Sequence, residues 1–185
     1  MNKIITILFL LLSISVLAQD KNEIAWTDSL KLTWNDFKGH SQKNNPSAAI
    51  SHCSINFDIS VQNDTAIIHV FNTFNKQKSW VKKNSDNDYI LNHEQKHFDI
   101  SEIFARMLRK QLLEEEFSYA NIQKNLNKIV ETNYHEAEKY QNKYDNETKH
   151  SLVVEKQEEW NLLIANQLKE FNNFTESELK VFVKR

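Results

Sequence analysis

The sequence predicts an α+β fold in which an N-terminal antiparallel β-sheet is followed by about three helices. Two observations support this prediction. Segments that alternate apolar and polar residues, or that are rich in β-branched and aromatic residues, fall between residues 30 and 74. Three longer segments in which apolar residues recur every three or four positions follow, between residues 89 and 171. Strands that precede helices are typical of α+β domains.

The N-terminus predicts a secretory signal peptide over residues 1–18. Lys3 precedes an almost wholly apolar run, Ile4–Leu17, and the small residue Ala18 suits cleavage. The run is shorter than the roughly 20 residues that a membrane-spanning helix needs. We therefore expect a secreted or periplasmic protein whose mature chain, residues 19–185, forms a single domain without a membrane span.

The composition excludes some functions. The formal net charge is −2 at pH 7, so no basic excess points to a nucleic acid partner. Cys53 is the single cysteine, which rules out an internal disulfide. Stability should therefore come from packing and, in addition, from a bound metal ion.

Four segments predict strands. Leu30–Phe37 alternates at its start and predicts a short strand. Ala48–Val61 and Thr65–Phe74 are separated by the turn Gln62–Asp64, so they should pair as an antiparallel hairpin. The tail around residues 179–183 alternates again and predicts either an added strand or a frayed end.

Three segments predict helices, Tyr89–Glu116, Ala120–Tyr144 and Leu152–Phe171. The first contains the pattern His-Glu-x-x-His at residues 93–97. At about 100° per residue, His97 lies about 40° around the helix from His93. Both histidines share a face with apolar side chains, and we expect that face to be buried. The opposite face should be solvated, since it carries Gln95, Asp99, Glu102, Arg106 and Lys110.

This spacing suits one zinc ion. Two neutral imidazoles one helical turn apart can bind a tetrahedral Zn²⁺, and Glu94 between them can act as general base toward water. The alternative is that His93 and His97 are two hydrogen-bonded core histidines. That reading needs a coincidence, because a chain with 7 histidines produces the pattern by chance roughly once in fifty sequences.

A catalytic zinc takes a third protein ligand. Asp99 and Glu102 lie about 160° and 140° around the helix from His97, so neither can reach the ion. The ligand must come from a later element, and the candidates are Glu131, His135 and His150.

We favour His150 because it lies in a short polar break between two amphipathic helices, where a side chain can be aimed without disturbing a packed face. Asp145 and Thr148 are close enough in sequence to orient its imidazole.

The helix motif resembles the bacterial secreted zinc-dependent protease family that was first catalogued as a domain of unknown function (922). Further landmarks of that family are Trp34-x-x-Phe37-x-Gly39, Ser79-Trp80, Leu91–Glu102, Tyr144-Asp145-x-x-Thr148-x-His150 and Gln157-x-x-Trp160. The resemblance implies a zincin-like metallopeptidase fold. It supports His150 as a ligand and adds Tyr144 to the residues that could support the site. Ser151 stands where the family pattern has a glycine.

We therefore expect a zinc-dependent metallopeptidase that acts on a peptide or protein substrate, with Thr65–Phe74 as the sheet edge beside which the substrate lies, by analogy with zincins. Tyr144, His135 and Arg106 are candidate donors to the developing oxyanion, although we expect Arg106 to face outward and pair with Glu102. The alternative function is a non-catalytic envelope binding module in which zinc only holds helices together.

Overall fold

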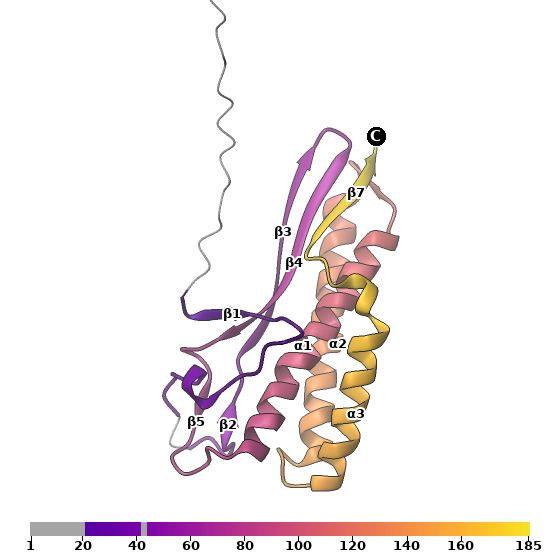
Figure 1. Ribbon diagram of the computed structural model, residues 1–185. Coiled ribbons are helices and arrows are strands. Elements are labelled where there is room, and N and C mark those ends of the chain that lie inside the picture. The colour runs from indigo at the N-terminus through magenta and orange to yellow at the C-terminus, as the bar shows by residue number, and fades with distance from the viewer. Residues whose placement is uncertain (1–20, 42–43) are drawn as a thin grey trace, which may run out of the picture.

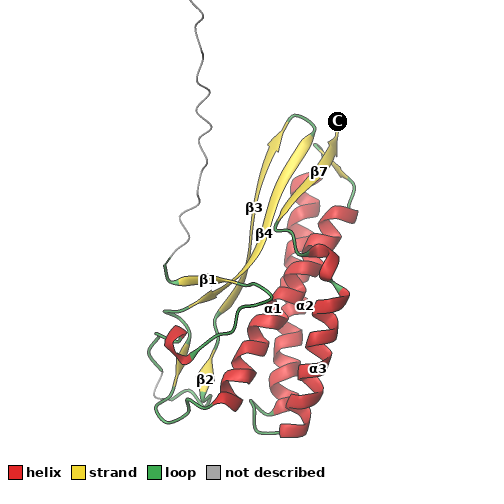
Figure 2. Ribbon diagram, viewed as in Figure 1, coloured by secondary structure: helices red, strands yellow, loops and turns green. Residues whose placement is uncertain are grey.

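The computed structural model describes residues 21–41 and 44–185, so the predicted signal peptide lies outside the described residues. Figure 1 shows the strands on one side of the molecule and three long helices on the other. The helices are α1 Asp88–Glu114, α2 Ile122–Thr148 and α3 Val154–Glu170. The strands are β1 Glu23–Ala25, β2 Ala49–Ile50, β3 Cys53–Gln62, β4 Thr65–Asn75, β5 Trp80–Val81, β6 Phe117–Ser118 and β7 Glu178–Lys184. The α+β prediction is confirmed (Figure 2). Strands β1–β5 precede the helices, whereas β6 follows α1 and β7 follows α3.

The predicted hairpin is confirmed and forms the longest part of the sheet. β3 and β4 pair antiparallel from Gln62↔Thr65 to Cys53↔Phe74, and Asn63 in the turn has φ 52. The C-terminal tail is a strand, β7, which pairs with the first half of β4, while β1 pairs with its last residues. β4 is thus covered on both sides, so the prediction that it is a sheet edge is wrong.

The predicted strand Leu30–Phe37 is also wrong, because its second half is a 3₁₀ turn, Trp34–Asp36. Thr33 donates from both its backbone nitrogen and its hydroxyl to Asp36 Oδ2, each at 2.9 Å. Such local bonds compete with strand pairing. The backbone nitrogen of Gly39 then donates to the carbonyl oxygen of Ser79. A Cβ at Gly39 would lie 2.6 Å from the carbonyl oxygen of Gln77, so a larger residue does not fit there.

Helix α1 lies at the centre of the molecule. Its apolar side chains pack against the sheet, against α2 and α3, and against the segment that precedes β2. α1 begins after Asn87, whose side chain accepts a hydrogen bond from the backbone nitrogen of Ile90. Among the described residues, no helix is long and apolar enough to cross a membrane.

The predicted solvated face of α1 is buried for four of its five residues. The exposed fractions are 6% for Gln95, 4% for Asp99, 3% for Glu102 and 1% for Arg106. The N-terminal segment covers this face and supplies partners, since Trp26 Nε1 donates to Asp99 at 3.0 Å and Asp28 pairs with Arg106 at 3.2 Å. Helical periodicity alone could not show that this segment folds back onto α1.

Glu102 is the centre of a buried ion cluster. Its Oε1 accepts from Arg106 Nε at 3.1 Å and from Arg109 Nη1 at 2.8 Å. Both guanidinium groups also donate to backbone carbonyls, those of Leu168 and Val70 among them. Because one carboxylate serves two buried cations, its loss would leave charge uncompensated in the core.

Glu102→Gln should therefore lower the free energy of unfolding by about 3 kcal/mol, as measured by urea denaturation. Glu114→Gln is the matched control, because Glu114 pairs with Lys110 on the surface at 4.0 Å. The control should change the free energy by less than about 0.5 kcal/mol. A loss in Glu102→Gln as small as that of the control would contradict the role of the cluster.

Candidate metal centre

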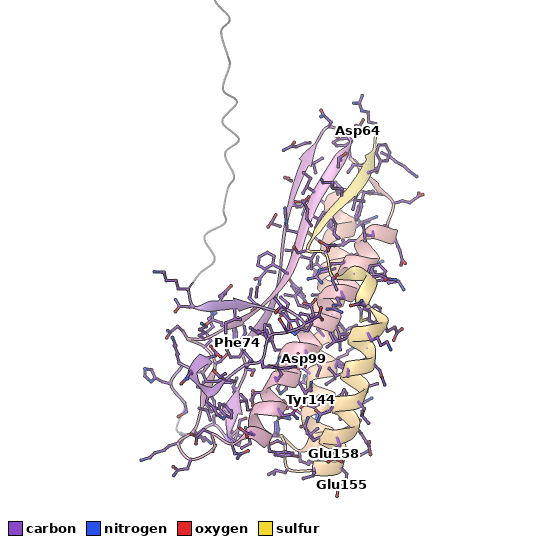
Figure 3. The ribbon with its side chains drawn as sticks, in the orientation of Figure 1. Asp64, Phe74, Asp99, Tyr144, Glu155 and Glu158 are labelled. Carbon is purple, nitrogen blue, oxygen red and sulfur yellow. The ribbon has the colours of Figure 1, made fainter. Side chains whose placement is uncertain are left out.

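Three side chains converge near the N-terminal end of α1. His93 and His97 lie one turn apart on α1, and Asp145 comes from the last turn of α2. Asp145 Oδ1 lies 3.1 Å from Nε2 of each histidine, and the two Nε2 atoms are 3.3 Å apart. Among the described residues, this is the group of side chains that could hold a metal ion. Figure 3 places the neighbouring Tyr144 in the half of the molecule away from the hairpin tip at Asp64.

Hydrogen bonds determine which ring nitrogen of each histidine faces the group. His93 Nδ1 lies 2.9 Å from Gln157 Oε1, and His97 Nδ1 lies 2.6 Å from Gln141 Oε1. An amide oxygen can only accept, so each Nδ1 carries the proton. Gln141 is held in this orientation because its Nε2 donates to the backbone carbonyl of His97. Each Nε2 therefore offers a lone pair to the same point.

The triangle of acceptor atoms fits zinc. Ligand atoms at about 2.0–2.1 Å from a tetrahedral ion lie about 3.3–3.4 Å apart, close to the observed 3.1–3.3 Å. Without a cation, three acceptors this close repel one another. Burial lowers the pKa of His97, but the hydrogen bond that the protonated ring donates to Asp145 and the charge of Glu94 outweigh it and raise that pKa to about 9. Burial raises the pKa of Asp145, but both histidines hold it well below its usual range.

Tyr144 and Thr148 support the site from behind. The ring of Tyr144 stacks on His93 with centroids 4.6 Å apart, and its hydroxyl donates to the carbonyl oxygen of His93. Thr148 is buried, and its hydroxyl donates to the carbonyl oxygen of Tyr144 at 2.8 Å. Thr148 thus stabilises the end of α2, and no hydrogen bond joins it to the imidazole of His150 among the described residues.

His150 lies beside the group but outside it. Its Nδ1 is 3.4 Å from Asp145 Oδ1, and its side chain is 59% exposed. Asp145, which we expected to orient His150, occupies the position beside the two α1 histidines instead. The spacing of residues in the sequence gave no reason to prefer Asp145 to His150 as a ligand. The signal that could have found Asp145 is its neighbour Tyr144, which is fully buried and therefore lies on the face of α2 that is turned toward α1.

The other proposed ligands are not brought to the site. Glu131 and His135 are exposed on α2, and neither lines the cavity in front of the group. Ten residues of helix separate His135 from Asp145, or about 15 Å. Arg106, considered as an oxyanion donor, belongs to the buried ion cluster on the opposite face of α1.

A cavity of about 290 Å³ opens in front of the group. Glu94 lines it and is 3% exposed, and its Oε2 has no hydrogen-bond partner among the described residues. A buried carboxylate oxygen without a partner is unfavourable unless a ligand or water supplies a donor. Cys53 also lines the cavity, but burial, with Glu94 and Asp99, raises the pKa of its thiol well above the usual value. Cys53 is therefore protonated and is no thiolate ligand.

Asp145→Ala should weaken zinc binding by more than the roughly 10–100-fold lost when a ligand's supporting partner is removed. Competition with a chromophoric chelator measures the affinity. Glu131→Ala, on the same helix but exposed, is the control and should bind zinc as the unchanged protein does. Equal affinity in the two variants would exclude Asp145 as a ligand.

The chain was also compared with known proteins. The family described as "Bacterial protein of unknown function (DUF922)" matches residues 16–151. The comparisons with curated proteins and with solved structures found no match. The matched region contains His93, Glu94, His97, Asp145 and His150. Because it spans most of the 185 residues, the chain belongs to the bacterial DUF922 family.

Proposed function

We propose that this protein is a secreted or periplasmic zinc-dependent peptidase in which His93, His97 and Asp145 hold the ion and Glu94 is the general base. One observation carries the proposal: the unpartnered carboxylate oxygen of Glu94 lines the same cavity as the three acceptor atoms. A zincin-like arrangement is part of the proposal, since two ligands lie on one helix and the third on a following helix. The apolar segment Ile4–Leu17 supports export.

These residues account for each proton transfer in the hydrolysis of a peptide bond. A bound zinc ion supplies a Lewis acid that lowers the pKa of water and polarises a carbonyl. Glu94 Oε2 accepts a proton from the attacking water as the new C–O bond forms. Glu94 then returns that proton to the amide nitrogen as the C–N bond breaks, so one water yields one carboxylic acid, which keeps the second proton of the water, and one amine.

The short strand β2 supports an extended peptide as substrate. β2 pairs with β5 through Ala49↔Val81 and Ile50↔Trp80, and Lys82 N donates to Ala48 O at 2.8 Å. Hydrogen-bonded and non-bonded pairs alternate in an antiparallel ladder. Ala49 therefore turns its N–H and C=O away from β5, and it lines the cavity. A peptide strand could pair with this edge of β2. β2 therefore takes the place of Thr65–Phe74 as the sheet edge beside which the substrate lies.

A non-catalytic envelope binding module with a structural ion is the second candidate. The observation that favours it is His150, whose ring lies close enough to Asp145 to supply a fourth ligand after a small movement. Four protein ligands would close the site to water, as in structural zinc sites.

Glu94→Gln should retain about one equivalent of zinc and lose at least about 100-fold in kcat, because removal of a general base typically costs 10²–10⁴-fold. Turnover of a quenched fluorescent peptide library and elemental analysis of the purified protein measure the two quantities. Glu138→Gln, an exposed change on α2, is the control. Zinc without turnover in the unchanged protein would favour the binding module.

Removal of the ion should lower the melting temperature by several degrees. Three buried or half-buried acceptor atoms lose their shared cation, and a loss of 1 kcal/mol shifts a domain of this size by about 2–4 °C. Differential scanning calorimetry before and after chelation measures the shift, and added zinc should restore it. An unchanged curve after verified removal would count against a metal held at these residues.

A further inference from the structure

The turn after α2 has an unusual backbone. Three consecutive residues, Lys149, His150 and Ser151, have φ values of 51, 51 and 71. L-residues other than Asn, Asp and His adopt this left-handed region rarely, and a run of three is unfavourable. Ser151 thus adopts the conformation for which the glycine of the family pattern is suited. Strain of this kind persists where the surrounding structure holds it, and it points to a position that matters for function.

The turn aims His150 at the cavity. The backbone nitrogen of His150 donates to the carbonyl of Asp145 at 3.0 Å, and Val153 N donates to Thr148 O at 2.9 Å. These bonds hold the imidazole at the cavity wall. Its Nδ1 lies 3.4 Å from Asp145 Oδ1, which exceeds the usual 2.7–3.2 Å of an N–H···O bond. The imidazole of His150 is therefore close to the metal-binding group but forms no hydrogen bond of normal length with Asp145.

The other side-chain nitrogens that line the cavity are already used. His93 and His97 donate through Nδ1 to Gln157 and Gln141, and the amide of Gln141 donates to the carbonyl of His97. Among the described side chains that line the cavity, His150 is the histidine whose ring nitrogens are not used in this way, so it can donate to a bound molecule. The earlier candidates for this role, Tyr144, His135 and Arg106, do not line the cavity.

We propose that His150 is a catalytic residue that donates a hydrogen bond to the carbonyl oxygen of the scissile peptide. This inference rests on the proposed hydrolysis. As water adds to the carbonyl carbon, the π electron pair moves onto that oxygen, where negative charge develops. A donor placed beforehand at this oxygen stabilises the charge and lowers the barrier. When the C–N bond breaks, the pair re-forms the carbonyl and the hydrogen bond weakens.

The test compares His150→Asn and His150→Gly with the unchanged zinc-loaded protein. Both replacements tolerate positive φ, so they remove the imidazole without adding backbone strain. We expect about one equivalent of zinc in both variants and a 10²–10³-fold loss in kcat, the effect of removing one oxyanion donor. KM should change less than about threefold, because the bond forms mainly in the transition state. His135→Ala, an exposed histidine on α2, is the control and should leave kcat unchanged.

A second measurement does not depend on turnover. A peptide phosphonate carries a charged oxygen where the oxyanion forms, and its affinity for zinc-loaded protein should fall at least tenfold in both His150 variants. Loss of zinc in both variants would make His150 a ligand and overturn the inference, as would an unchanged kcat. If the unchanged protein does not cleave peptides, the proposed function fails. The phosphonate then tests only whether His150 donates to a charged oxygen bound beside the ion, and equal affinity in all proteins would overturn that contact as well.

Discussion

Three acceptor atoms held within 3.3 Å of one another repel unless a cation or a proton lies among them, and much of this fold serves to hold them. The backbone of α1 sets the spacing of His93 and His97. Gln157 on α3 and Gln141 on α2 keep both lone pairs aimed at one point. The stacked ring of Tyr144 prevents His93 from turning away. All three helices are therefore needed to define one small triangle.

The two faces of α1 make different kinds of contact. On the site face, histidines lie against an aromatic cluster that includes Tyr144 and Trp160. On the other face, Asp99 and Glu102 bind the N-terminal segment and two arginines. Gln95, inside the metal motif, accepts a hydrogen bond from the backbone of Leu32. The position of the motif is thus determined from both sides, which limits how far its histidines can move.

Local patterns predicted the elements well, and non-local contacts explain the errors. The three helices, the hairpin and the His-Glu-x-x-His site follow from periodicity and spacing within short windows. The burial of Asp99 and Arg106 does not, because it depends on Trp26 and Asp28, more than 70 residues away. The central place of β4 depends likewise on β7, which follows it by more than 100 residues. The position of Asp145 at the metal-binding group depends on how α2 packs on α1, which no sequence window contains.

The pairing of β4 with β7 has a consequence for how the chain acquires its final form. Half of β4 has no second neighbour until residues 178–184 are available, and the hydrogen-bond partner of His93 Nδ1 lies at residue 157. A chain emerging from its N-terminus therefore cannot orient that histidine before residue 157 is synthesised, and it cannot complete the sheet before residues 178–184 are synthesised. Contacts between such distant segments form slowly. Proteolytic removal of residues 178–184 would likewise uncover the first half of β4, and the exposed strand would become a place where copies of the chain aggregate.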